Sequence, residues 1–162
     1  MDKYIIRRGC KEDMPGVWNL IYELAVFEKE PDAVEVTVED LERDGFSENP
    51  KFEVFVAEIS DEIVGIALFY YRYSTWKGPT IHLEDLVVKE AKRGLGIGKS
   101  LYNEVMRFAF DKKVRRVEWD VLDWNTNAID FYEKTGATML RDWNAVKMYE
   151  KALDAYIKKI DG

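Results

Sequence analysis

The chain has 162 residues, of which 47% are hydrophobic and 14% aromatic, and it carries a formal net charge of −7 at pH 7. This length and composition indicate one folded domain spanning residues 1–162 and exclude extended disorder. The negative charge disfavours nucleic acid as a partner and favours small cationic molecules. The longest apolar run, residues 63–71, is too short to cross a membrane, and residues 1–4 lead into a strand pattern without a signal-peptide core.

The chain contains one cysteine, Cys10, and one histidine, His82. A single cysteine excludes an internal disulfide and is consistent with a cytoplasmic location. One residue of each type argues against a His/Cys metal site, so we expect no metal. We interpret Cys10 as a buried or capping residue in preference to a nucleophile.

Apolar periodicity predicts the elements of the N-terminal half. Thr37 and Asp40 have the spacing of a capping box, which predicts the start of a short helix. The predicted elements are, in order, a strand at residues 4–7, an amphipathic helix at 12–27, an acidic loop at 27–36, a short helix from 37 to about 44, and a β-hairpin of strands 52–59 and 63–73.

The C-terminal half alternates strands and helices. The predicted elements are a strand at residues 80–88, a helix from 97 to about 113, a strand at 116–121, a helix at 126–134 with Gly136 as its C-cap, strands at 138–140 and 145–150, and a final helix at 153–160. Hairpins followed by a β-α-β-α order predict an α/β or α+β fold with a mixed sheet.

Three glycines at alternate positions, Gly94, Gly96 and Gly98, separate the strand that ends at Val88 from the following helix. Glycine permits positive φ and a close approach of ligand to backbone, and a helix N-terminus attracts anions. Lys89, Lys92, Arg93 and Lys99 make this the most basic segment of an acidic chain. The pattern favours a phosphate site, with a tight turn that binds nothing as the alternative.

Two known phosphate-binding patterns fit this loop poorly. A dinucleotide-binding G-x-G-x-x-G motif needs its third glycine where Lys99 stands. A Walker A loop shares the ending Gly98-Lys99-Ser100, but Arg93 stands where its first glycine belongs. A P-loop-like nucleotide-binding protein therefore remains an alternative.

Residues 93–98 resemble the R-G-x-G-[IV]-[GA] loop of the GNAT superfamily of N-acetyltransferases, and residues 125–137 resemble a second segment of that superfamily. Residues 24–28, 44–46, 76–78 and 83–85 are similar to the spermidine/spermine and thialysine N-acetyltransferase group. The resemblance implies a three-layer fold, in which helices cover both faces of a central mixed and largely antiparallel sheet with splayed middle strands. It also implies a homodimer.

The resemblance implies acetyl-CoA as co-substrate. The backbone of the strand end would pair with pantetheine, the glycine loop would hold the pyrophosphate, and two residues near the next helix would lie by the pantetheine and adenine. The residues implied are Leu86, Val87, Val88, Arg93, Gly94, Leu95, Gly96, Ile97, Gly98, Lys99, Asn125 and Ala128.

Acetylation of an amine requires proton removal, because a primary alkyl amine has a pKa of about 10.4 and is almost entirely protonated at pH 7. The resemblance implies Glu84 as the base, acting directly or through water, and Tyr132 as the acid for the departing thiolate. Without the resemblance, we would interpret Glu84 as a structural carboxylate and Tyr132 as an aromatic residue of the core. His82 is expected on the same strand face as Glu84. We interpret it as a structural residue in preference to a proton relay.

For the amine, the resemblance implies an aromatic and acidic pocket lined by Phe27, Glu28, Trp76, Asp85 and Trp143. Neighbouring strand residues face opposite ways, so Glu84 and Asp85 reach one pocket only if a β-bulge turns one of them. The predicted function is acetyl-CoA-dependent N-acetylation of a polyamine, diamine or lysine-like amine. A non-catalytic acyl-CoA sensor and a protein N-acetyltransferase are further alternatives.

Overall fold

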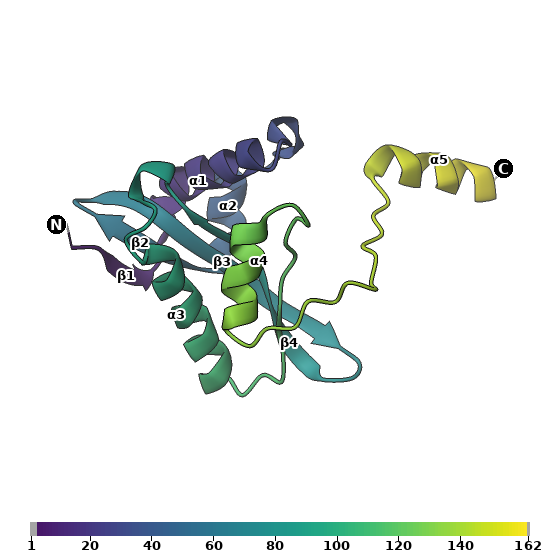
Figure 1. The fold of residues 1–162 in the computed structure, drawn as a ribbon. Helices are drawn as coiled ribbons and strands as arrows, with labels where there is room; N and C mark the ends of the chain where they lie inside the picture. Colours follow the sequence, from purple (N-terminus) through teal and green to yellow (C-terminus); the bar gives the residue numbers. More distant parts are fainter. Residues whose placement is uncertain (1–2, 162) are drawn as a thin grey trace. The chain divides into compact units, whose positions relative to one another are not determined.

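A computed structural model describes residues 3–161, and the chain divides into two compact units, Met1–Leu122 and Asp123–Gly162. The first unit contains a five-stranded sheet in the order β1-β2-β3-β4-β5, in which every neighbouring pair is antiparallel except β4 and β5 (Figure 1). The strands are β1 (Ile5–Arg8), β2 (Glu53–Ile59), β3 (Glu62–Ser74), β4 (Gly78–Val88) and β5 (Val117–Glu118).

Helices cover both faces of this sheet. On one face, α1 (Met14–Phe27) and α2 (Val38–Gly45) pack against Val54, Val56, Ile66, Leu68 and Val87. On the other face, α3 (Ile97–Asp111) packs so closely that a Cβ on Gly65 would lie 3.1 Å from the Ile97 side chain. This confirms the predicted fold class of a mixed, largely antiparallel sheet between helical layers.

Local sequence signals account for several boundaries. The predicted capping box forms at the start of α2, because Asp40 N–H donates to Thr37 Oγ1 at 3.2 Å and Thr37 N–H donates to Asp40 Oδ2 at 3.0 Å. Three short 3₁₀ helices lie at Lys11–Asp13, Pro31–Ala33 and Glu90–Lys92.

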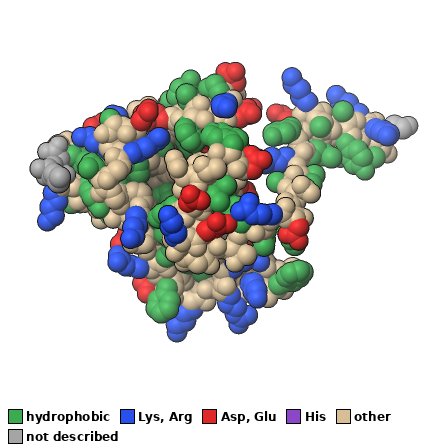
Figure 2. Space-filling model, in the orientation of Figure 1, with side chains coloured by type: hydrophobic (Ala, Val, Ile, Leu, Met, Phe, Trp, Pro, Cys, Tyr) green, Lys and Arg blue, Asp and Glu red, His purple; other side chains and the backbone are tan. Residues whose placement is uncertain are grey.

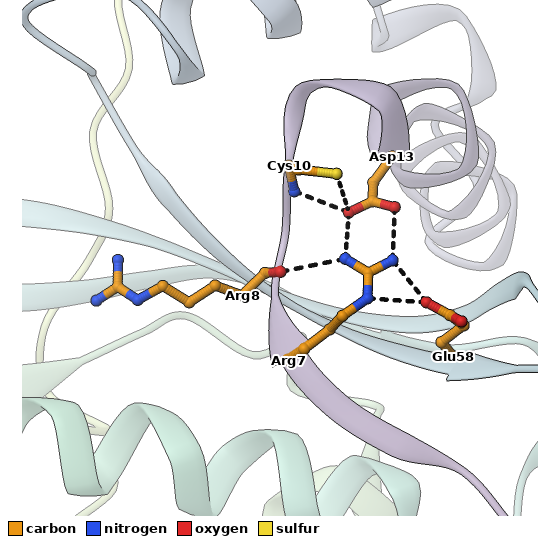
Figure 3. Close-up of polar contacts among 5 residues, drawn as sticks. All are labelled: Arg7, Arg8, Cys10, Asp13 and Glu58. Carbon is orange, nitrogen blue, oxygen red and sulfur yellow. Dashed lines mark hydrogen bonds and ion pairs between the residues drawn. The ribbon is translucent and has the colours of Figure 1, made fainter.

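Figure 3 shows how Arg7 ties β1 to β2 and to the start of α1. Its guanidinium donates to both carboxylate oxygens of Asp13, at 2.7 and 2.8 Å, and to Glu58 on β2. The hydrogen bonds from Arg7 hold the pKa of Asp13 below its usual range. Cys10 is the N-cap of the first 3₁₀ helix and is exposed, so the capping alternative is correct and the buried one is wrong.

The second unit contains α4 (Thr126–Lys134) and α5 (Glu150–Ile160). Asn125 Oδ1 accepts from Ala128 N–H at 3.4 Å and caps α4, and Gly136 ends it at a φ of +92°. Figure 2 shows hydrophobic side chains along α5, where Leu153, Tyr156 and Ile157 are exposed.

Two predicted strands, at residues 138–140 and 145–150, do not form, and α5 begins within the second. Most of their apolar side chains stay exposed, up to 92% for Val146, because no strand of the described chain pairs with this segment. The strand predicted at 116–121 forms only at Val117–Glu118. Among the described residues, no helix is long and apolar enough to cross a membrane.

Candidate active site

A β-bulge at Glu84 shapes the middle of β4. Leu68 of β3 pairs with Asp85 whereas the next residue, Phe69, pairs with Leu83, so Glu84 is one residue in excess. Leu68 belongs to the core on the α1 face, which places Asp85 on that face. The Glu84 carboxylate contacts Tyr70, two residues beyond Leu68, and therefore turns to the same face. The condition for Glu84 and Asp85 to share one site is met.

Two neighbours hold the Glu84 carboxylate. Tyr70 Oη donates a hydrogen bond to Glu84 Oε2 at 2.9 Å, and His82 Nε2 lies 3.3 Å from the same oxygen. The rings of Tyr70 and His82 are themselves in contact, with centroids 5.2 Å apart. Burial and the bond to Glu84 raise the pKa of Tyr70 to about 12, so its hydroxyl stays protonated and remains a donor at neutral pH.

Asp85 is the strongly perturbed carboxyl of this region. Burial and, to a lesser extent, the nearby carboxylates of Glu84 and Glu28 together raise the pKa of Asp85 to about 7. Glu28 directly follows the last residue of α1. Three acidic side chains thus lie within electrostatic reach of one another, and a bound cation would relieve their repulsion.

The second half of β4 has an open edge. β5 pairs only with Ile81 and His82, so no strand of the described chain covers that side of β4 beyond His82. Lys89 N–H donates to Val64 O at 2.8 Å, which sets the alternation along the β3–β4 ladder. By this alternation Val87 directs its N–H and C=O to β3, while Leu86 and Val88 direct theirs to the open edge.

The glycine loop leads from this edge into α3. Gly94 and Gly96 both have a φ of +81°, a conformation that side-chain-bearing residues rarely adopt. No side chain caps α3, and its first backbone bond runs from Ser100 N–H to Gly96 O at 3.0 Å. The N–H groups of residues 97–99 precede that bond, and N–H groups at this position of a helix are typical anion ligands.

Arg93 contacts both predicted ligand regions. Its Nε donates to Val88 O, on the open edge, at 3.1 Å. Its guanidinium lies 5.6 Å from the ring centroid of Phe27, the last residue of α1. A residue predicted for the cofactor therefore contacts one predicted for the amine.

Five further predicted residues belong either to another part of the first unit or to the second unit. Trp76 is in the turn between β3 and β4 and is 79% exposed, about 20 Å of strand from Glu84. Asn125, Ala128, Tyr132 and Trp143 belong to the second unit, where Tyr132 is 8% exposed and Trp143 is exposed.

Tyr70 is the site residue that sequence reasoning missed. Its place in an aromatic run gives no indication of function, because such runs are typical of buried strands. The pairing of Tyr70 with His82 across β3 and β4 is the signal that distinguishes it, and this pairing depends on the register after the bulge.

No group of three or more His, Cys, Asp or Glu side chains among residues 3–161 is arranged to hold a metal ion. The arrangement is instead suited to two ligands, with the glycine loop and the open strand edge on one side of the bulge and a partly exposed acidic cluster at the bulge. Such a site defines a transferase that brings an anionic cofactor to a cationic acceptor.

Comparison with known proteins identifies the family. The model of the acetyltransferase (GNAT) family matches residues 18–137. The chain belongs to this family, and it is therefore an N-acetyltransferase that takes its acetyl group from acetyl-CoA.

Several curated relatives match most of the chain. Thialysine N-epsilon-acetyltransferase from Bos taurus is 38% identical over 92% of this chain and 94% of its own length. The enzyme of that name from Caenorhabditis elegans is 38% identical over 85% of this chain and 87% of its own. Spermidine/spermine N(1)-acetyltransferase-like protein 1 from Homo sapiens is 37% identical over 85% of this chain, but only 21% of its own length is matched.

Solved structures share the fold. An integron cassette protein from the mobile metagenome of V. cholerae superposes with a TM-score of 0.78 at 24% identity, covering 96% of this chain and 98% of its own. An aminoglycoside N-acetyltransferase in complex with CoA superposes with a TM-score of 0.69 at 18% identity, covering 91% of this chain and 95% of its own.

Proposed function

We propose that this N-acetyltransferase acetylates a primary amine of a small cationic substrate, namely a polyamine, a diamine or a lysine-like amino acid. The observation that carries the proposal is the acidic cluster of Glu28, Glu84 and Asp85 at the bulge of β4. Such a cluster favours a ligand with positive charge. The named substrates of the relatives, thialysine and spermidine or spermine, support the same class.

The residues around the glycine loop fit acetyl-CoA. The polar backbone groups of Leu86 and Val88 lie on an uncovered strand edge, where an amide-bearing chain adds like a strand. The loop from Arg93 to Lys99 supplies backbone N–H groups and positive charge for a pyrophosphate. Acetyl-CoA supplies the acetyl thioester, and Asn125 and Ala128 of the second unit are proposed to complete its site.

Glu84 is the proposed base. It takes a proton from the substrate ammonium, directly or through water, so that the neutral amine carries the lone pair that attacks the acetyl carbon. Tyr132 is the proposed acid, whose hydroxyl proton goes to the departing sulfur. Direct transfer needs no acyl-enzyme and hence no nucleophilic side chain. Partial desolvation of the thiol and its hydrogen bond to Asp13 raise the pKa of Cys10, which suits it poorly to nucleophilic attack.

Phe27 and Glu28, at the end of α1, are proposed to bind the amine together with Asp85, and Trp76 and Trp143 are further proposed contacts. Trp76 lies far along the β3–β4 hairpin from Glu84. It can contact the amine only if the substrate is long enough to reach this turn, or if the turn of a second copy of the chain approaches the site. We further propose a cytoplasmic homodimer. One functional domain is supported by the family match, which spans the division after Leu122.

The test is a substrate panel of spermidine, spermine, putrescine, lysine and thialysine, followed by thiol release from acetyl-CoA. We expect turnover with at least one amine and none with matched alcohols. Calorimetry with acetyl-CoA alone separates the alternatives. Binding without turnover of any amine indicates an acyl-CoA sensor or a protein N-acetyltransferase. Absence of binding at millimolar acetyl-CoA would contradict the proposed cofactor site.

A further inference from the structure

His82 and Tyr70 lie directly against the proposed base. His82 is 9% exposed, whereas the Glu84 side chain is 50% exposed. His82 is the last residue of β4 with strand partners on both sides, Tyr70 on β3 and Glu118 on β5. Glu84, as the excess residue of the bulge, has no partner of its own in the register. An exposed carboxylate thus lies against two aromatic side chains.

Both contacts converge on one atom. Tyr70 Oη at 2.9 Å and His82 Nε2 at 3.3 Å approach the same oxygen, Glu84 Oε2. A carboxylate held through one oxygen keeps a defined orientation of the other. The ring contact between Tyr70 and His82, with centroids 5.2 Å apart, fixes the two donors relative to each other.

The surroundings of His82 select its tautomer. Within the described part of the chain, His82 Nδ1 is buried and has no hydrogen-bond partner. A buried unpaired N–H costs more than an unpaired acceptor, so the proton of the neutral ring belongs on Nε2, facing Glu84 Oε2. His82 then has a donor toward the carboxylate, as Tyr70 does.

We propose that His82 is a positioning residue for the acetyl transfer, which together with Tyr70 orients the Glu84 carboxylate toward the incoming ammonium. This inference rests on the proposed role of Glu84 as the base. His82 itself touches neither substrate nor cofactor in this role, and it acts through Glu84 Oε2. A fixed orientation lowers the barrier because the base is already in place when the amine binds.

The test uses His82→Phe, which retains an aromatic ring against Tyr70 but removes both nitrogens. We expect kcat with the preferred amine to fall about tenfold, while the KM for acetyl-CoA stays unchanged, because Glu84 is misoriented but the cofactor loop is not. His82→Gln restores a nitrogen donor near the position of Nε2 and is expected to restore most of the activity. Tyr70→Phe removes the other donor and is expected to lower kcat in the same way.

A double-mutant cycle with Glu84→Gln distinguishes positioning from a general structural role. We expect Glu84→Gln alone to lower kcat about 100-fold, and His82→Phe to add nothing further in that background. The matched control is Thr80→Val, which removes another buried polar group of β4, one that bonds to Arg72 O. Its thermal stability should fall, and its kcat should not.

Each other outcome has one meaning. If Glu84→Gln is slow but His82→Phe is as fast as the parent, the positioning role is wrong and the proposed base stands. If His82→Phe slows the enzyme equally with and without Glu84, the histidine does not act through this carboxylate and the inference is overturned. If Glu84→Gln retains full kcat, Glu84 is not the base. The proposed role of His82, which depends on that assignment, is then also wrong.

Discussion

The two halves of β4 differ in what covers them. Before the bulge, Ile81 and His82 have strand partners in both β3 and β5 and are buried. After it, Leu86 and Val88 have register partners in β3 only and direct their N–H and C=O groups to an open edge. One extra residue, Glu84, separates the two halves.

The difference has a physical origin. Ile81 N–H points toward Arg116 O, on the β5 side of β4. Without the bulge, strand alternation would point the backbone N–H and C=O groups of residues 83, 85 and 87 to that same side. The insertion of Glu84 shifts this parity, so Leu86 and Val88 face the open edge instead. The same insertion turns two acidic side chains to one face. A buried half that carries His82 and a half with an open edge are thereby built from one strand.

The prediction with the largest expected effect asks whether the residues of β4 suffice for acetyl transfer without Tyr132. Tyr132 lies in the second unit, and we expect Tyr132→Phe to lower kcat about 100-fold through loss of the general acid. The matched control is Tyr102→Phe, because Tyr102 is another nearly buried tyrosine, 6% exposed, on α3. Steady-state kinetics on both variants provides the measurement. Equal turnover of Tyr132→Phe and the parent would remove the acid role and leave the chemistry to β4.

A second prediction concerns Asp85, the first residue after the bulge. Its raised pKa of about 7 means that the folded state binds the proton more tightly than the unfolded chain does. The free energy of unfolding therefore falls as pH rises from about 4 to about 7 and then levels off. Asp85→Asn removes this loss.

We expect Asp85→Asn to raise the free energy of unfolding at pH 8 by roughly 1–3 kcal/mol and to leave it nearly unchanged at pH 4. Urea unfolding at the two pH values is the measurement. Asp13→Asn is a matched control of opposite sign, because hydrogen bonds from Arg7 hold the pKa of Asp13 low and stabilise the fold above pH 4. A uniform effect of Asp85→Asn at both pH values would contradict the assigned cause.

Sequence patterns predicted the first unit better than the second. The helix of residues 12–27 and the hairpin strands have apolar faces that this unit buries, so periodicity and structure agree. The strand predicted at 145–150 has the same apolar character, but strand formation depends on a partner that the pattern does not contain. Val146 is accordingly exposed and α5 begins at Glu150.

The site shows the same limit. The glycine loop was predictable because Gly94 and Gly96 meet a local backbone requirement, a positive φ. From the sequence, a bulge was only the condition under which Glu84 and Asp85 could share one pocket. No residue in 83–85 requires a bulge by its own backbone preference. Its position follows from the register between β3 and β4, and the contacts of Glu84 with Tyr70 and His82 follow from it. Tertiary register therefore determines what local sequence leaves open.

The smallest expected effect compares the two ends of β4 directly. Gly78 begins the strand with a φ of +78°, Gly94 follows it with a φ of +81°, and a Cβ at either would meet nothing within 4 Å. Substitution by alanine imposes the same backbone strain at both positions, and each variant should lose about 1 kcal/mol of stability. Gly94→Ala should in addition raise the KM for acetyl-CoA about fivefold, because strain in the loop displaces N–H groups from the pyrophosphate. Gly78→Ala, at the other end of β4 and away from the glycine loop, should leave that KM unchanged. Equal KM values in the two variants would mean that the open end of β4 does not lead into the cofactor site.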